Sequence, residues 1–211
     1  MLQAMVAAAE RVFEFLEQPE EIETAKGEID TSKIKGNVEF KHVNFGYDED
    51  KTIINDFSAN IKEGQKIAIV GPTGAGKTTM VKLLMRFYDV NSGEINIDGH
   101  NIKDFKRGEL RKMFGMVLQD TWLFGGTVKE NIKYGNEEAT DGEVIEAAKA
   151  AHVHHFIKTL PKGYNSILNE ESSNVSAGQK QLLTIARVIL ANPKILILDE
   201  ATSSIDTRTE I

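Results

Sequence analysis

Apolar residues at the start of the chain recur at the three-to-four spacing of an amphipathic helix, at Leu2, Met5, Ala9, Val12 and Leu16. We therefore expect a helix over 1–16. Charged residues interrupt the apolar run and no small-residue cleavage site follows it, which argues against a signal peptide. Two interpretations stay open: the helix packs on its own domain, or it is an extension from a domain that the chain lacks.

The next stretch is acidic and then mixed in charge, with structure breakers at Pro19, Gly27 and Gly36. Such composition predicts a linker. Short alternating runs follow, in which Val38 and Phe40 share one phase. A period of two is typical of half-buried strands, so we expect an antiparallel sheet near the start of the domain. The phase changes around 42, which predicts a β-bulge.

A different pattern occurs at Lys66–Val70, where a continuous apolar run ends in glycine and precedes a helical stretch over 76–88. A short run without alternation is typical of a strand in a buried parallel sheet. Further apolar runs at 95–97, 115–118 and 195–198 predict more strands. Helical stretches lie between them, so the pattern predicts an α/β fold.

Two long helices are expected in the second half of the chain. Thr140 and Glu143 form a capping-box pattern, and that helix should run to about Thr159. The other should start near Ser176 and end at Ala191. The first of these helices also carries three histidines, at positions 152, 154 and 155. We interpret them as solvated or capping residues, because no carboxylate stands at a spacing that supports a metal site.

Composition limits the classes of function. The 211 residues, 41% of them hydrophobic and 27% charged, fit one folded domain with or without an appendage. Lys and Arg total 25 against 32 Asp and Glu, so the net charge of −7 provides no general basic field for nucleic acid. Cysteine is absent, which excludes disulfides and thiolate zinc sites. No apolar run approaches the roughly 18 residues that a membrane-spanning helix needs.

The strongest chemical signal follows the predicted strand at 66–70. It is formed by Gly71, Pro72, Thr73, Gly74, Ala75, Gly76, Lys77 and Thr78. This run satisfies G-x-x-x-x-G-K-[ST] between a strand and a helix, the pattern of a phosphate-binding loop. Backbone N–H groups and the helix N-terminus would hold phosphate oxygens. Lys77 would neutralise the β- and γ-phosphates, and the hydroxyl of Thr78 would ligate Mg²⁺.

Two acids, Asp199 and Glu200, end the apolar run at 195–198. The carboxyl ends of central parallel strands are where ligands bind in open α/β sheets. We expect Asp199 to orient Mg²⁺ or its water, and Glu200 to act as general base toward an attacking water.

A weaker motif, at 174–179, precedes the second long helix. Ser176 is a good N-cap, and the small residues beside it leave backbone donors open to an anion. Any capped helix looks similar, so the meaning of this motif comes from its position between the phosphate loop and the acidic pair.

Taken in order, these motifs resemble the nucleotide-binding domain of ATP-binding cassette (ABC) transporters. The family has a stacking aromatic, a Walker A loop, a glutamine loop, a signature, a Walker B strand with its glutamate, and a D-loop. The corresponding positions are Tyr47, Gly71–Thr79, Gln119, Val175–Gln179, Ile195–Glu200 and Ser203–Asp206. The resemblance covers 37–211.

The resemblance implies a role for each matching residue. Catalysis is implied for Glu200 and Gln119, and Mg²⁺ binding for Thr78, Gln119 and Asp199. ATP contacts are implied for Tyr47, the loop from Gly71 to Thr79, Ser176, Ala177, Gly178, Gln179 and Asp206.

Further stretches are similar to exporter-type segments, at 123–132 and 160–164, and so is the amphipathic start of the chain. The resemblance thus implies that 1–36 are a helix and linker from a missing transmembrane domain. It implies that 37–211 form the ABC domain, truncated at its C-terminus, with a helical subdomain at about 120–180. The implied fold is a P-loop NTPase with a RecA-like core, an N-terminal antiparallel β subdomain and this inserted α-helical subdomain.

The sequence also departs from the family. Ala177 replaces the usual glycine and adds a methyl group where backbone should approach a phosphate closely. The loop at 169–173 lacks the usual exporter pattern. The family's switch histidine would lie beyond Ile211, so we expect the catalytic set in this chain to be incomplete.

The implied function is ATP binding and hydrolysis that powers export, at the cytoplasmic face of the membrane in the full-length protein, with this fragment itself soluble. Two copies would pair head to tail and contact transmembrane domains, and no nucleic acid is expected. One alternative is a soluble ABC-type ATPase of translation or DNA repair, although no long coiled coil separates the motifs. Another is a regulatory cassette that binds ATP without turning it over.

Overall fold

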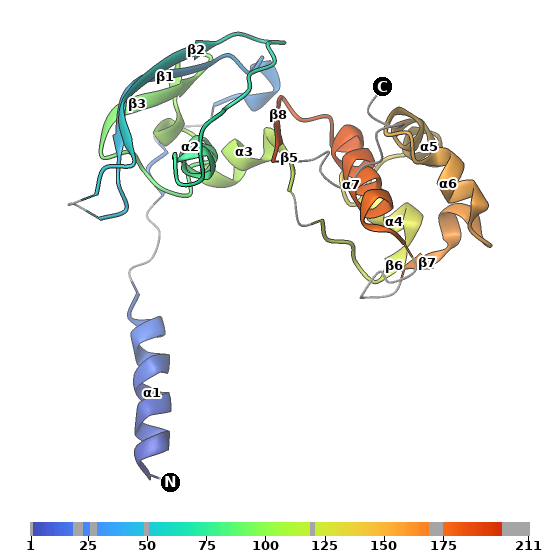
Figure 1. Ribbon diagram of the computed structural model, residues 1–211, viewed down its shortest axis with the longest axis horizontal. Coiled ribbons are helices and arrows are strands. Elements are labelled where there is room, and N and C mark those ends of the chain that lie inside the picture. Colours follow the sequence, from blue (N-terminus) through green and yellow to red (C-terminus); the bar gives the residue numbers. More distant parts are fainter. Residues whose placement is uncertain are drawn as a thin grey trace.

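The computed structural model describes residues 2–18, 23–25, 29–48, 51–118, 121–168 and 175–199. Two lobes, each with its own apolar core, are joined near a short pair of strands, and an N-terminal helix projects from the first lobe (Figure 1). The core of the first lobe extends from Ile34 to Phe114, and that of the second from Leu123 to Ala186.

The first lobe is built on an antiparallel sheet with the strand order β2-β1-β3-β4. Its strands are β1 (Val38–Phe45), β2 (Ile54–Ile61), β3 (Ser92–Ile97) and β4 (His100–Asn101). Pairing of β1 with β2 shifts between Phe40 and Val43, and His42 between them has a φ of 49°. The bulge predicted from the change of phase is therefore confirmed, and it keeps both Phe40 and Val43 in the core.

Helices α2 (Lys77–Leu84) and α3 (Arg107–Lys112) belong to this lobe, together with the 3₁₀ turns η1 (Thr31–Lys33) and η2 (Ile102–Asp104). Leu83 of α2 and Leu110 of α3 are fully buried in the same core as the sheet. Asp98 accepts backbone hydrogen bonds from Lys35 at 2.6 Å and Gly36 at 2.9 Å. The end of the predicted linker is thus fastened to the β3–β4 turn.

Two predicted strands pair in parallel, β5 (Phe114–Val117) and β8 (Ile195–Leu198). The strand predicted at Lys66–Val70 does not form: these residues belong to no helix or strand, and Val70 is 85% exposed. An apolar run becomes a buried parallel strand only when neighbouring strands satisfy its backbone. Within the described residues, no strand pairs with 66–70, and Leu196 and Leu198 of β8 are exposed.

The second lobe is mainly helical. It contains the hairpin of β6 (Gly126–Thr127) and β7 (Ile167–Leu168), the turn η3 (Gly163–Asn165), and the helices α4 (Val128–Lys133), α5 (Asp141–Ala150), α6 (His154–Thr159) and α7 (Ala177–Ala191). The capping box of Thr140 and Glu143 and the predicted length of α7 are both confirmed.

The helix predicted from Thr140 to Thr159 is in fact two, because His152 adopts a left-handed φ of 57° between α5 and α6. The break allows both Val153 and Ile157 to be buried. His154 lies with Nδ1 2.8 Å from the hydroxyl of Tyr164, and no metal-binding group of His, Cys, Asp and Glu occurs in the part of the chain that the structure describes.

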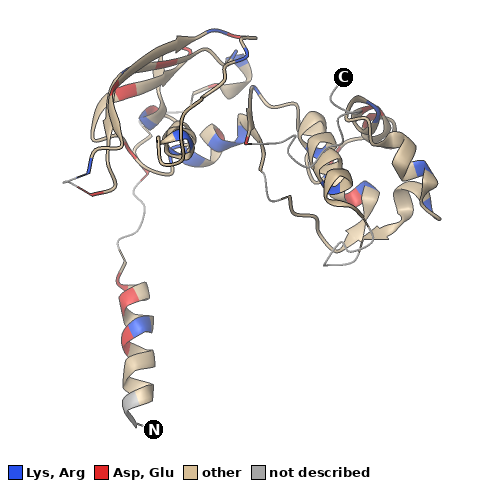
Figure 2. Cartoon of the chain, viewed as in Figure 1, with Lys and Arg blue, Asp and Glu red and all other residues tan. Residues whose placement is uncertain are grey.

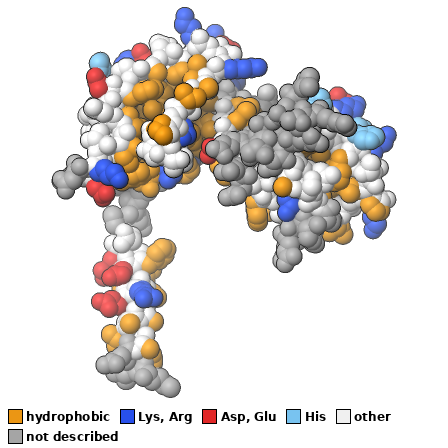
Figure 3. Space-filling view, viewed as in Figure 1, with side chains coloured by type: hydrophobic (Ala, Val, Ile, Leu, Met, Phe, Trp, Pro, Cys, Tyr) orange, Lys and Arg blue, Asp and Glu red, His pale blue; other side chains and the backbone are white. Residues whose placement is uncertain are grey.

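Helix α1 (Leu2–Leu16) is the predicted amphipathic helix, and it stands away from both lobes (Figure 1). Its acidic and basic residues lie in its C-terminal half (Figure 2). Hydrophobic side chains are exposed along it (Figure 3), and Phe13 and Phe15 are among them. Of the helices described, none is both long and apolar enough to cross a bilayer.

Candidate nucleotide site

The phosphate-binding loop predicted at 71–78 leads directly into α2. Gly74 and Gly76 have φ values of 84° and 86°, which favour glycine. Gly76 immediately precedes α2, and a Cβ there would lie 3.1 Å from Cγ2 of Ile53. The backbone therefore requires glycine at the point where the loop turns into the helix, and the first N–H groups of that helix have no partner within it.

The ammonium group of Lys77 lies on this loop. Its Nζ donates to the carbonyl oxygens of Gly71 at 2.7 Å and Pro72 at 3.1 Å. These acceptors are neutral, and hydrogen bonds to charged acceptors are shorter and stronger. A phosphate is therefore a stronger acceptor for the ammonium group of Lys77 than the two carbonyl groups are.

Two neighbouring threonines of α2 have different environments. Thr78 is exposed, so its hydroxyl is accessible to a ligand, while Thr79 is buried and its Oγ1 lies 3.3 Å from the hydroxyl of Tyr47. A hydroxyl and a carboxylate such as Asp199 are the oxygen donors that Mg²⁺ prefers. The residues predicted to hold the metal are thus of a suitable chemical type.

Tyr47 contributes an aromatic surface beside α2. The residue is 44% exposed, and its ring packs edge-on against Phe45 and Tyr88, each with a centroid separation of 5.0 Å. The ammonium of Lys82 lies 5.8 Å from its centroid. The ring is therefore fixed in place yet partly accessible, which suits stacking of a base. Tyr88 and Lys82 were not predicted from the sequence; the only signal was their position in the helical stretch over 76–88.

The acidic residue after β8 is placed by the two-stranded parallel pair. The N–H of Asp199 donates to the carbonyl of Val117 at 3.0 Å, and Leu198 is paired with Val117. The carboxyl ends of β5 and β8 therefore meet at one edge. Gln119 follows β5 closely in the sequence, but Gln119, Glu200 and Asp206 all lie outside the described residues.

The signature motif forms the N-terminus of α7. Ser176 accepts from the N–H of Gln179 at 3.2 Å, and its own N–H donates to Oε1 of Gln179 at 2.9 Å. This capping box uses the side chain of Gln179 to close the first turn. Ser176 and Ala177 are exposed, whereas Val175 is buried in the second core, so the helix end is anchored and still accessible.

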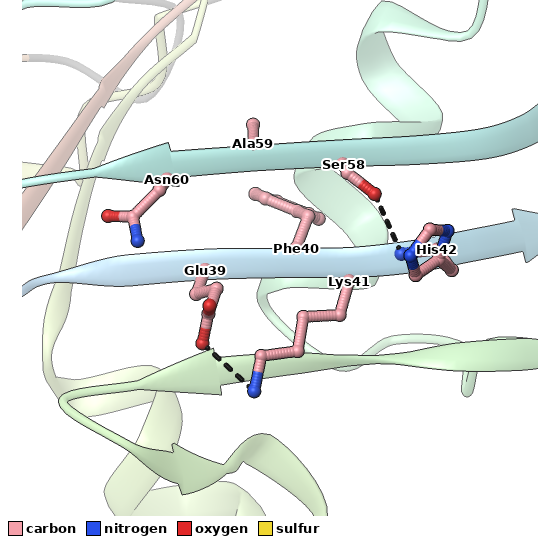
Figure 4. A pocket seen from close by; sticks show the side chains of 7 residues that line it. All are labelled: Glu39, Phe40, Lys41, His42, Ser58, Ala59 and Asn60. Carbon is pink, nitrogen blue, oxygen red and sulfur yellow. Dashed lines mark hydrogen bonds and ion pairs between the residues drawn. The ribbon is translucent and has the colours of Figure 1, made fainter.

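Walker A and the signature lie in different lobes of the chain, α2 in the first and α7 in the second (Figure 1). A shallow depression of about 400 Å³ occurs elsewhere, on β1 and β2, where the backbone N–H of His42 donates to the hydroxyl of Ser58 (Figure 4). Nδ1 of His42 lies 2.7 Å from Oδ1 of Asp56. None of the predicted nucleotide residues lines the depression.

Comparison with known proteins identifies the family. The ABC transporter family matches residues 54–203. The chain is 55% identical over its whole length to a fatty acid ABC transporter ATP-binding/permease protein of Mycobacterium bovis, covering 33% of that protein. It is 48% identical to a putative multidrug export ATP-binding/permease protein of Bacillus subtilis, over 97% of the chain and 36% of that protein.

The solved structure of a bacterial Atm1-family ABC exporter with ATP bound superposes with a TM-score of 0.84 and 41% sequence identity, over 99% of this chain and 36% of that one. The chain thus spans about a third of the length of the relatives that it matches. With the family matched over most of the chain and a relative more than half identical, the chain belongs to the ABC transporter family.

Proposed function

We propose that this domain binds Mg-ATP between two copies arranged head to tail and hydrolyses it to drive export through transmembrane domains. The observation that carries the proposal is the loop at 71–76, where glycines at positive φ precede α2 and where Nζ of Lys77 donates to the loop carbonyl groups. The half-exposed Tyr47 contacts Thr79 of the same helix. In this arrangement the loop and Lys77 bind the phosphates, and Tyr47 stacks on the adenine.

The second contact to ATP comes from the accessible N-terminus of α7. In the proposed pair, Ser176, Ala177 and Gly178 of one copy approach the γ-phosphate held by Lys77 of the other, where the positive end of the helix favours an anion. Support for two copies comes from the placement of the two motifs in different lobes, each exposed. Asp206, in the D-loop of the resemblance, would contribute at the same interface.

When bound, Mg²⁺ would neutralise charge on the β- and γ-phosphates, held by Thr78, Asp199 and Gln119. The chain's own contribution to the reaction is made by Glu200, which accepts a proton from the water that attacks the γ-phosphate in line. Gln119, which follows β5 in the sequence, would help to orient the same site.

The finer fold and the partners are part of the proposal. We propose that the parallel pair of β5 and β8 belongs to a RecA-like core and that an inserted helical subdomain spans about 120–180. Residues 1–36 connect the domain to a transmembrane domain at the cytoplasmic face of the membrane, in keeping with the exposed apolar side chains of α1. Relatives described as ATP-binding/permease proteins support this partner.

A second candidate is a regulatory cassette that binds ATP without hydrolysing it, and Ala177 favours it because its methyl group lies on the exposed helix end. Binding and turnover must therefore be measured separately. Calorimetry with Mg-ATP should show binding by the chain and at least a tenfold loss in Lys77→Ala, with Lys112→Ala, an exposed lysine paired to Glu109, as matched control.

Phosphate release by the natural full-length protein in liposomes should then separate the two candidates, because the exporter domain loses turnover in Glu200→Gln and the regulatory cassette has none to lose. Equal Mg-ATP affinity in the Lys77→Ala variant would contradict both candidates.

A further inference from the structure

Three aromatic side chains form one exposed surface on the second lobe, which we call the aromatic surface: Trp122, Phe124 and Tyr134. The rings of Trp122 and Phe124 are 4.3 Å apart, and those of Phe124 and Tyr134 are 4.4 Å apart. Trp122 is 63% exposed and Tyr134 is 58% exposed. The surface begins a few residues after β5, in the chain segment that joins the Walker B edge to the second lobe.

Arg187 of α7 lies against this surface. Its guanidinium carbon is 5.3 Å from the ring centroid of Phe124 and 5.4 Å from that of Tyr134. Its Nη1 also donates to the carbonyl of Trp122 at 3.3 Å. Burial lowers the pKa of Arg187, but an arginine stays protonated in proteins. The charged guanidinium of Arg187 therefore packs against two rings of the aromatic surface.

Asn131 of α4 extends this contact to the backbone. It is 2% exposed, its Nδ2 donates to the carbonyls of Phe124 at 2.9 Å and Thr127 at 3.1 Å, and its Oδ1 accepts from the N–H of Phe124 at 2.8 Å. Arg187 donates from Nε to the carbonyl of Asn131 at 2.8 Å and from Nη2 to its Oδ1 at 3.1 Å. One guanidinium thus joins α7 to α4 and to the loop that carries the aromatic rings.

The end of α4 and the backbone of α7 are in close contact beside Arg187. Gly135 follows α4 closely, and a Cβ there would lie 2.1 Å from the carbonyl oxygen of Arg187. Arg187 belongs to the same helix that Ser176 caps, roughly 16 Å further along at 1.5 Å per residue. A continuous helix moves as a rigid element, so a displacement at Ser176 is also a displacement at Arg187.

We propose that Arg187 is a positioning residue that transmits movement of α7, caused by ATP at its N-terminus, to the aromatic surface. The inference rests on the proposed function, since it is the ATP sandwich that moves α7. The planar fork of arginine fits this role because it makes the ring contacts and three hydrogen bonds together, whereas a lysine offers a single flexible ammonium.

The chain contains a single tryptophan, so Trp122 reports on this surface directly. The natural full-length protein, labelled with 5-fluorotryptophan and carrying Glu200→Gln to retain nucleotide, is titrated with Mg-ATP and followed by ¹⁹F NMR. The Trp122 resonance is assigned by its loss in Trp122→Phe. We expect Mg-ATP to shift it, the shift to fall at least threefold in Arg187→Lys, and no shift in Arg187→Met, with Mg-ATP affinity unchanged within twofold.

Arg111→Lys is the matched control. In the first lobe, its guanidinium lies 4.6 Å from the ring of Phe87 and donates to the carbonyl of Arg86 at 3.1 Å, so it repeats the chemistry of Arg187 on another surface. This variant should keep the full Trp122 shift.

A full-sized shift in both Arg187 variants would overturn the inference, and so would a wild-type Trp122 that does not respond although Mg-ATP binds. If Arg187→Met fails to fold, the Mg-ATP-induced shift of the Trp122 resonance in Arg187→Lys tests the inference. Absence of Mg-ATP binding by the wild type would instead contradict the proposed function, and the inference with it.

Discussion

The hydroxyl of Tyr47 lies 3.3 Å from Oγ1 of Thr79, a buried residue of the helix that follows the phosphate-binding loop. This contact connects the aromatic side of the candidate site to its phosphate side. With Phe45 and Tyr88 packed edge-on against the same ring, the position of Tyr47 relative to α2 is set before any nucleotide arrives. Less ordering is then needed on binding, which favours affinity.

The first prediction concerns this ring. Tyr47→Ala should weaken Mg-ATP binding by roughly 1–3 kcal/mol, because base–aromatic stacking has that magnitude. Tyr47→Phe keeps the ring and loses only the contact to Thr79, so its loss should stay below about 1 kcal/mol. Isothermal titration calorimetry measures both, with Tyr134→Ala, an exposed tyrosine of the second lobe, as control. If Tyr47→Ala and the wild type bind Mg-ATP with equal affinity, Tyr47 serves core packing and does not stack on the base.

The second prediction separates the two acids at the end of β8. Glu200→Gln should retain Mg-ATP and slow hydrolysis by about 10²–10⁴-fold, because general-base catalysis contributes that much. Asp199→Asn should in addition raise the Mg²⁺ concentration needed for half-maximal ATP binding. Steady-state phosphate release and a Mg²⁺ titration at fixed ATP distinguish the variants. If Glu200→Gln hydrolyses ATP at the wild-type rate, Glu200 is not the general base.

The third prediction concerns Asp98, which fastens 35–37 to the β3–β4 turn. Burial acts to raise its pKa, but hydrogen bonds from the side chain of Asn37 and from the backbone of Gly36 and Lys35 outweigh this, so the pKa lies below its usual value. Because the carboxylate is the form favoured by folding, it stabilises the fold at neutral pH. That stabilisation is lost as the pH falls through the lowered pKa.

Asp98→Asn should therefore lower the free energy of unfolding by about 1–2 kcal/mol at pH 7, since an amide offers one acceptor oxygen instead of two. The difference from wild type should shrink as the pH falls below about 4. Urea unfolding at both pH values measures it, with Glu137→Gln, an exposed carboxylate, as control. If the difference in the free energy of unfolding between Asp98→Asn and wild type persists at low pH, the charge of Asp98 is not the source of the stabilisation.

Features fixed by neighbouring residues were predictable from the sequence. The bulge at His42 followed from a change of phase, and the ends of α7 followed from Ser176 and from Asn192, which adopts the left-handed conformation before Pro193. In each case the signal and the structure lie within a few residues of each other. The glycines and lysine of the phosphate loop belong to the same class.

Features that depend on distant segments were not predictable. Whether 66–70 forms a strand depends on which strand lies beside it, and the run itself carries no such information. Tyr88 packs on Tyr47, and Arg187 reaches Trp122, across 41 and 65 positions of sequence. The break at His152 was missed because burial of Val153 and Ile157 outweighs the continuity of one helix.

The last prediction concerns Ala177, the first residue of α7. In the proposed pair its methyl group faces the γ-phosphate held by the other copy, where glycine would let the backbone come closer. Ala177→Gly should therefore raise ATPase turnover several-fold at a given protein concentration. The cost to the helix stays below about 1 kcal/mol, since the substitution lies at its first turn, where Ser176 and Gln179 keep the cap.

The measurement is the ATPase rate per chain as a function of protein concentration. If two copies form the active unit, the rate per chain rises with concentration and then saturates, and Ala177→Gly should move saturation to lower concentration without changing Mg-ATP affinity at Lys77. Gly142→Ala, at the exposed first turn of α5, controls for a general effect of such exchanges. A rate per chain that is independent of concentration in both proteins would mean that one copy hydrolyses ATP alone, and the helix end at Ser176 would then have no part in the reaction.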